Sequence, residues 1–143
     1  MRTVLSRWWP TGVVLLGAFV ALTSVGGVLG LAVAVLMVAY AFVLSPALFP
    51  RSADLGEARR KADAGQAPMV VWKPGCIYCV RMRLGLRGSG RRVSWVDSSI
   101  DEDAQALVRA ANDGDHTTPT VFVSGRSRTN PDVDWVREQV RGH

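Results

Sequence analysis

The chain has 143 residues, a formal net charge of +5 and only two cysteines. Two cysteines exclude a disulfide-stapled scaffold, because such small secreted folds need several pairs. The positive charge comes from arginines scattered among acidic residues, with two lysines and no basic patch interleaved with aromatics, so we expect no nucleic-acid binding.

The first third of the chain is apolar. No charged residue lies between Arg7 and Arg51, and this run is too long for a single crossing of a bilayer core of about 30 Å. Turn-forming residues interrupt it at Thr23, Ser24, Gly26, Gly27 and Gly30. The pattern predicts a transmembrane hairpin over residues 1–50, with helices at about 10–24 and 28–48. The expected interfacial anchors are Trp8, Trp9, Tyr40, Phe42 and Phe49. The alternative is a signal peptide, but its apolar region spans only about 7–15 residues.

Arginines flank the apolar run on both sides, and the turn between the two predicted helices carries no charge. The positive-inside rule then predicts a multi-pass protein of the inner (plasma) membrane with both flanks, and therefore the remaining domain, in the cytoplasm. In that reducing compartment a cysteine pair is catalytic or metal-binding more often than structural.

Residues 51–67 are predicted to form a basic juxtamembrane linker. Asp54 and Glu57 have the spacing of a helix capping box, and Gly65 with Pro68 would end such a helix. With so few apolar residues, the segment is either a solvated spacer, which we favour, or a basic helix lying on anionic lipid.

The remaining residues, 68–143, alternate between strand and helix patterns. Strands are predicted at 69–72, 93–96 and 120–123, with a turn and a short edge strand in 124–129. Helices are predicted at 77–86, from a capping box at Ser99 and Glu102 to about 111, and from Pro131 onward with Asn130 as its cap. The order βαβαββα predicts an α/β domain with a mixed sheet. Trp72 and Trp95 are expected in its core, and His116 is expected to be a solvated loop residue.

A Cys-x-x-Cys motif, Cys76-Ile77-Tyr78-Cys79, follows the first strand and opens a helix, which is typical of a thioredoxin-like redox site. Backbone N–H groups and the dipole at a helix start favour the thiolate of Cys76, and Lys73 adds a nearby positive charge. Cys79 lies one turn further into the helix. We therefore expect Cys76 to be the nucleophile and Cys79 the resolving thiol.

Three segments resemble the glutaredoxin family. Lys73-Pro74-Gly75-Cys76-Ile77-Tyr78-Cys79 is similar to the dithiol centre of glutaredoxins, and Thr117-Thr118-Pro119-Thr120-Val121 to their segment with a cis-proline. Thr129-Asn130-Pro131 stands where glutaredoxins have a glycine pair and resembles the mycoredoxins, which use mycothiol instead of glutathione. The resemblance implies a thioredoxin/glutaredoxin fold with no counterpart for the apolar hairpin.

The resemblance also implies a substrate site. Thr118 and the cis Pro119 should lie beside Cys76 and pair with a thiol substrate as a strand would. Asp132 matches an acidic residue that helps to hold glutathione in the relatives. The alternative is that Asp132 only stabilises the dipole of the last helix. Tyr78 should flank the groove, where Thr129 and Asn130 would add side chains in place of the glycines.

The function expected is reduction of mixed disulfides between proteins and a low-molecular-weight thiol, mycothiol or glutathione, with no bound cofactor. The partners would be thiolated or disulfide-bearing proteins, the small thiol and the membrane. The alternative is a non-enzymatic iron–sulfur cluster or metal carrier tethered to the membrane. Zinc is disfavoured because a structural site needs four ligands and only His116 and His143 would remain beside the cysteines.

Overall fold

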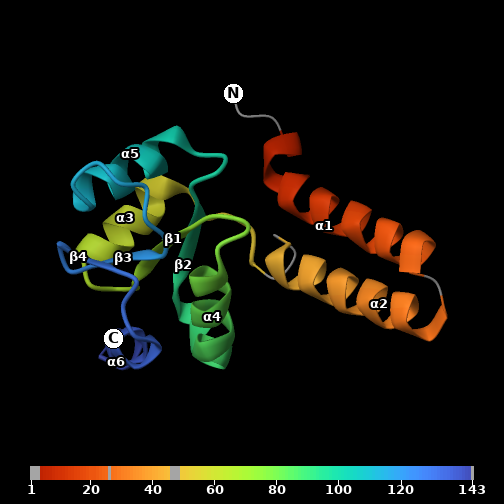
Figure 1. Ribbon diagram of the computed structural model, residues 1–143. Coiled ribbons are helices and arrows are strands. Elements are labelled where there is room, and N and C mark those ends of the chain that lie inside the picture. The colour runs from red at the N-terminus through yellow and green to blue at the C-terminus, as the bar shows by residue number, and fades with distance from the viewer. Residues whose placement is uncertain (1–3, 26, 46–48, 143) are drawn as a thin grey trace.

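The protein is described by a computed structural model that covers residues 4–25, 27–45 and 49–142. Two N-terminal helices form a hairpin beside a small α/β domain (Figure 1). The elements in chain order are α1 (Val4–Val25), α2 (Gly27–Leu44), α3 (Leu55–Asp63), β1 (Met69–Trp72), α4 (Ile77–Leu86), η2 (Arg87–Arg92), β2 (Ser94–Asp97), α5 (Glu102–Ala111), β3 (Thr120–Val123), β4 (Arg126–Thr129) and α6 (Val133–Arg141).

The four strands form a single mixed sheet in the order β2-β1-β3-β4. β1 pairs in parallel with β2, with Val70 opposite Trp95, and antiparallel with β3, with Val70 also opposite Val121. β4 pairs antiparallel with β3 and forms an exposed edge, as the sequence predicted. The crossover through α4 joins the two parallel strands. The predicted α/β class with a mixed, thioredoxin-like sheet is confirmed.

Helices cover both faces of this sheet. Successive residues of a strand point to opposite faces of the sheet. Because β1 is buried throughout, its side chains pack into two separate hydrophobic cores, one on each face. Val70 and Trp72 pack with residues of α4 and α6. Met69 and Val71 pack with residues of α3 and α5. The end of β1 is thereby fixed from both sides, and the Cys-x-x-Cys motif follows it directly.

Helix α3 lies in the segment that we expected to be a solvated spacer, and that expectation is wrong. The predicted cap is present, because the Asp54 carboxylate accepts the Glu57 N–H at 2.8 Å. However, Ala58 and Ala62 are 2% and 0% exposed and belong to the core beneath the sheet. Two buried alanines are enough to pack this short helix against the sheet. Because alanine is small and only weakly apolar, the hydropathy pattern of the segment did not reveal this packing.

The predicted helical hairpin is present, but its bounds differ. α1 starts at Val4 and α2 ends at Leu44, and Gly27, with a φ of 59°, opens α2. Across the described ranges, none of the helices combines the length and apolar character that a membrane crossing requires. The prediction of membrane-spanning helices, and of the multi-pass inner-membrane location drawn from it, is therefore wrong.

Phe49 joins the segment after the hairpin to the core of the domain. Its ring stacks on Trp72, with centroids 3.7 Å apart and planes 9° apart, and meets Trp95 edge-on at 5.6 Å. Phe49 is 8% exposed, so it is a core residue and not the interfacial anchor that we expected. Tyr40 and Phe42 are exposed, whereas the side chains of Trp8 and Trp9 lie outside the described residues. The expectation that Trp72 and Trp95 are core residues is confirmed.

Two helix starts also differ from prediction. α5 is capped by Asp101, not by Ser99, because the Asp97 carboxylate binds the Ser99 N–H and hydroxyl in the preceding turn. α6 begins at Val133 after Asp132 in the cap position. Asn130 has a φ of 42°, outside the extended region that an N-cap residue adopts.

Candidate active site

Cys76 is itself the N-cap residue of α4. Its backbone is extended, and its sulfur accepts the Cys79 N–H at 3.2 Å. The sulfur thus occupies the place of the oxygen in an ordinary N-cap, where the positive end of the helix dipole favours an anion. Cys76 is 9% exposed.

Cys79 lies directly behind Cys76 and is 0% exposed. Its thiol donates a hydrogen bond to Cys76 Sγ at 2.6 Å. This bond, followed by the Thr118 side chain, the Cys79 N–H and the charge of Lys73, lowers the pKa of Cys76 to about 6 against the opposing effect of burial. Burial, together with the interaction with Cys76, raises the pKa of Cys79. The two thiols therefore differ strongly in acidity, with the outer one the more acidic.

This difference predicts the pH profile of alkylation. A thiol whose pKa is lowered keeps its reactive thiolate above that pKa and loses it as the pH falls below. Iodoacetamide should therefore modify Cys76 at a rate that is half-maximal near pH 6, with Cys79 unmodified at that pH. Mass spectrometry of the quenched, digested chain measures both sites. Faster labelling of Cys79 than of Cys76 would contradict the assignment.

A loop with a cis peptide bond between Thr118 and Pro119 lies against Cys76, as the resemblance implied. The Thr118 carbonyl oxygen is 3.3 Å from Cys76 Sγ and accepts its S–H when the thiol is protonated. The Asn130 N–H donates to the Pro119 carbonyl at 2.7 Å. The segment that follows β4 is thereby tied to the proline loop beside the cysteine.

Lys73 and His116 meet at the other side of this loop. Lys73 Nζ donates to the His116 carbonyl at 3.5 Å. The His116 ring contacts Ser98 through Nε2 at 2.9 Å, so His116 is not the solvated loop residue that we expected. Ser98 follows β2 and lies far from His116 in the sequence, so no local pattern could have revealed this contact.

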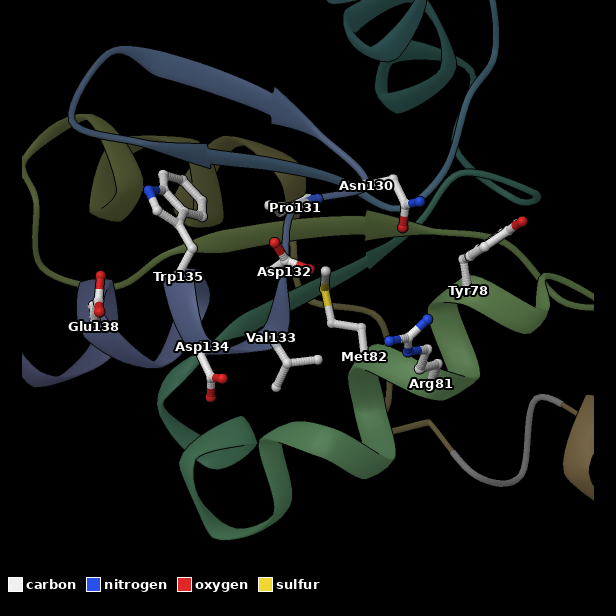
Figure 2. A pocket seen from close by; sticks show the side chains of 10 residues that line it. All are labelled: Tyr78, Arg81, Met82, Asn130, Pro131, Asp132, Val133, Asp134, Trp135 and Glu138. Carbon is white, nitrogen blue, oxygen red and sulfur yellow. The ribbon is translucent and has the colours of Figure 1, made fainter.

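A groove of about 430 Å³ opens between α4 and α6 (Figure 2), and its lining includes Tyr78 of the Cys-x-x-Cys motif but neither cysteine. Tyr78, whose side chain is exposed, stands at its α4 side, and Asn130 and Asp132 lie across from it. The full lining is Tyr78, Arg81, Met82, Asn130, Pro131, Asp132, Val133, Asp134, Trp135 and Glu138. Asp132 makes no side-chain cap bond to α6, so its carboxylate remains available to the groove.

The structure brings together most, but not all, of the predicted site residues. Lys73, Thr118 and Pro119 surround the cysteine pair. Thr129 instead turns away, and its hydroxyl hydrogen-bonds the Asn112 side chain beside α5. Throughout the described ranges, no group of three or more His, Cys, Asp or Glu side chains is arranged to hold a metal ion.

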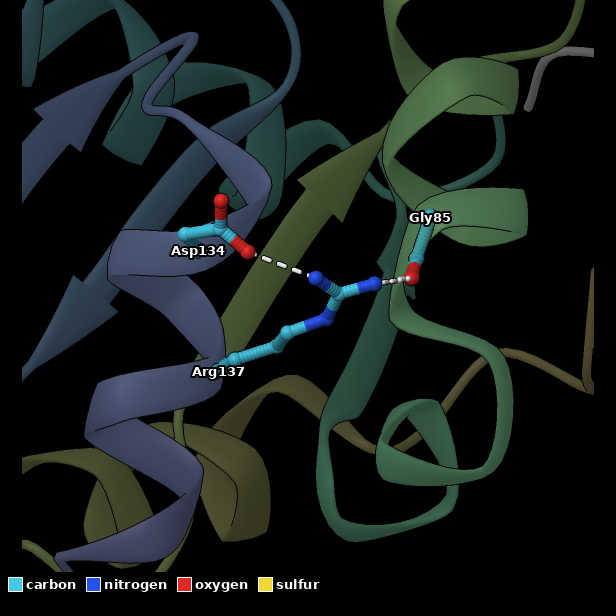
Figure 3. Close-up of polar contacts among 3 residues, drawn as sticks. All are labelled: Gly85, Asp134 and Arg137. Carbon is cyan, nitrogen blue, oxygen red and sulfur yellow. Dashed lines mark hydrogen bonds and ion pairs between the residues drawn. The ribbon is translucent and has the colours of Figure 1, made fainter.

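Arg137 fixes the distance between the two helices that form the groove (Figure 3). One guanidinium nitrogen binds the Asp134 carboxylate at 2.6 Å, and another donates to the Gly85 carbonyl near the end of α4. Gly85 also faces Val133, where a Cβ on Gly85 would lie 2.8 Å from one methyl carbon and 2.9 Å from the other. The close approach of α4 and α6 therefore requires glycine at this position.

Replacing Gly85 with alanine should destabilise the domain by about 1–3 kcal/mol, the usual cost of overpacking. Gly88→Ala is the matched control, because a Cβ there meets no atom within 4 Å. Urea unfolding measures both variants. Adding Val133→Ala to Gly85→Ala should recover part of the loss, and equal stability of the Gly85 and Gly88 variants would contradict the close contact.

Comparison with known proteins agrees with this geometry. The family model described as Glutaredoxin matches residues 69–128, which include β1, the cysteine pair and the proline loop. A candidate glutaredoxin of Mycobacterium tuberculosis strain CDC 1551 / Oshkosh is 33% identical over 66 residues, covering 46% of this chain and 79% of that protein. A counterpart in M. tuberculosis strain ATCC 25618 / H37Rv matches with the same identity and coverage. With Cys76 of its Cys-x-x-Cys motif capping a helix beside the proline loop of a mixed sheet, the chain belongs to the glutaredoxin family.

Proposed function

We propose that the chain is a thiol–disulfide oxidoreductase that removes a small thiol from mixed disulfides with proteins, and that mycothiol is this small thiol. The observation that carries the proposal is the placement of Cys76 Sγ at the start of α4, where the Cys79 N–H and thiol both donate to it. The activity is assigned to residues 68–143, with α3 covering one face of their sheet.

In the proposed reaction the Cys76 thiolate attacks the small-thiol sulfur of the mixed disulfide. A new bond forms between Cys76 and the small thiol, and the protein leaves as a thiolate that takes up a proton. A second small-thiol molecule then attacks this adduct, which releases the symmetric small-thiol disulfide and restores Cys76. On a disulfide between two protein cysteines, Cys79 instead attacks the intermediate and leaves a Cys76–Cys79 disulfide.

The other site residues are assigned supporting roles. Lys73 stabilises the Cys76 thiolate, in keeping with its part in lowering the Cys76 pKa. The backbone of Thr118 and Pro119 aligns the substrate next to the sulfur. Tyr78, Asn130 and Asp132 hold the body of the small thiol in the groove. The Thr129 hydroxyl is bound to the Asn112 side chain, so Thr129 is assigned no direct contact with the small thiol and only precedes Asn130 in the chain.

The charge of the groove supports mycothiol over glutathione. Its lining includes three carboxylates, those of Asp132, Asp134 and Glu138, and one cation, Arg81. Asp134 is paired with Arg137, which leaves an excess of free carboxylates. Glutathione carries two carboxylates of its own, whereas mycothiol presents sugar hydroxyls, which donate hydrogen bonds to carboxylates. The resemblance of Thr129-Asn130-Pro131 to the mycoredoxins points to the same small thiol.

The test compares two substrates that differ only in the small thiol. One model protein with a single cysteine is loaded with mycothiol or with glutathione, and its deglutathionylation or demycothiolation is followed with the matching thiol as reductant. We expect kcat/KM to be at least about tenfold higher for the mycothiol form, a difference of about 1.4 kcal/mol. Equal rates would overturn the choice of mycothiol, and no turnover of either would overturn the enzyme.

The carrier alternative gains no specific support, since the described residues provide no ligand cluster beyond the cysteine pair. Iron and colour in protein purified without oxygen would favour it.

A further inference from the structure

His116 lies where three segments of the active site meet. It precedes the proline loop by one residue, and its carbonyl accepts the hydrogen bond from Lys73. Its ring reaches Ser98, the residue that follows β2. Ser98 in turn binds the carbonyl of Trp72, the last residue of β1, through its hydroxyl at 3.0 Å and its N–H at 2.9 Å.

The direction of these bonds can be assigned. Ser98 has one hydroxyl proton, and that proton is directed at the Trp72 carbonyl. With that proton engaged, the oxygen accepts in its contact with His116, which corresponds to the ring tautomer that carries its proton on Nε2. Ser98 is buried and His116 is partly buried, so this hydrogen bond is shielded from solvent on its Ser98 side and restrains both residues. The chain of bonds runs from the end of β1, through Ser98, to the loop that carries Thr118.

The loop has two contacts with the segment around Cys76, and both lie within two residues of His116. Thr118, two residues after His116, places its carbonyl at the Cys76 sulfur. Lys73, three residues before Cys76, is held by the His116 carbonyl itself. A movement of His116 would therefore displace Thr118 and Lys73, the two residues whose contacts connect this loop to the segment around Cys76.

We propose that His116 is a positioning residue for the nucleophile: its ring, anchored on Ser98, holds the proline loop and Lys73 at the distances that keep Cys76 reactive. The inference rests on the proposed role of Cys76. In this proposal His116 acts through Thr118 and Lys73.

The test is the pH profile of Cys76 alkylation in the full chain, measured by mass spectrometry for His116→Ala, His116→Gln and Ser98→Ala. His116→Ala should lower the Cys76 rate at pH 6 about threefold, because the Thr118 side chain and the charge of Lys73, unlike the Thr118 carbonyl, favour the thiolate. Ser98→Ala removes the acceptor for the ring, and it also removes the hydroxyl bond to the Trp72 carbonyl, which the Ser98 N–H still binds; it should have the same effect. His116→Gln should stay within about twofold of wild type, since its amide can donate to Ser98. Ser127→Ala, on the exposed edge strand, is the control.

The double variant His116→Ala/Ser98→Ala should be no slower than either single variant, because both remove the same hydrogen bond. Profiles of His116→Ala and Ser98→Ala that overlay the wild type would overturn the proposal, and so would a glutamine variant as slow as the alanine one. If His116→Ala does not fold, Ser98→Ala and His116→Gln decide the matter. A wild-type profile with its midpoint near the ordinary cysteine pKa would instead overturn the role of Cys76, which separates the two failures.

Discussion

Cys76→Ser should abolish reduction of every disulfide substrate, with a loss of roughly a thousandfold or more, as expected when a covalent nucleophile is removed. Cys79 cannot replace it, because that thiol is fully buried and its pKa is raised. The measurement is turnover of a mixed disulfide by the purified full chain in excess small thiol. Residual activity above about a tenth of wild type would mean that another group begins the exchange.

Cys79→Ser provides the comparison, because its effect should depend on the substrate. The mixed disulfide with a small thiol needs only Cys76, so turnover should persist within about tenfold of wild type. A disulfide between two protein cysteines needs Cys79 to resolve the intermediate, so its reduction should fail. Cys79→Ala, which leaves no side-chain donor to Cys76, should move the alkylation midpoint of Cys76 above pH 6, whereas the serine hydroxyl can still donate. Equal loss on both substrates would contradict the division of roles.

Phe49→Ala should destabilise the protein by about 3–5 kcal/mol, the usual cost of truncating a buried phenylalanine. The ring fills the space against Trp72 and Trp95, and its removal would leave a cavity directly beneath the end of β1. Denaturant unfolding followed by tryptophan fluorescence measures this loss.

The matched control for that experiment is Phe42→Ala in α2. Phe42 is 60% exposed, so its truncation should change the free energy of unfolding by no more than about 0.5 kcal/mol. If both variants lose the same small amount, the segment at Phe49 does not contribute to the core of the domain.

The regular part of the fold followed from local sequence patterns. The β-branched run of β1 and the cysteine spacing at the start of α4 each depend on a few adjacent residues, and both were predicted within a residue or two. The cap at Asp54 was also predicted, because the Asp54–Glu57 spacing directly sets the hydrogen bond observed.

The errors arose where a distant residue or a competing bond decides the local structure. Ser99 has the sequence of a helix cap, but Asp97 uses both of its donors, so the helix starts later. Phe49 ends an apolar run and was assigned to a membrane interface, whereas two tryptophans in later strands bury it. His116 was assigned to solvent because its partner, Ser98, lies beyond a helix.

In the candidate site, too, the sequence predicted the features that depend on adjacent residues and missed those that depend on distant ones. Cys76, Cys79 and Lys73 belong to one short motif, so the sequence placed them correctly relative to one another. The groove combines α4 with the residues that follow β4, and its charge becomes visible only when these segments are brought together. Thr129 was expected to face the ligand, but the side chain of a strand residue can take either face, and here it bonds Asn112.

The most direct test of the mechanism is to identify the intermediate. The full chain carrying Cys79→Ser is mixed with a mycothiol-loaded protein, without added free thiol, then acid-quenched and analysed by intact and peptide mass spectrometry. The mechanism predicts one mycothiol disulfide-linked to Cys76, with an equal amount of substrate protein released as free thiol. An unmodified Cys76 after prolonged incubation, or a stable link between Cys76 and the substrate protein itself, would contradict it.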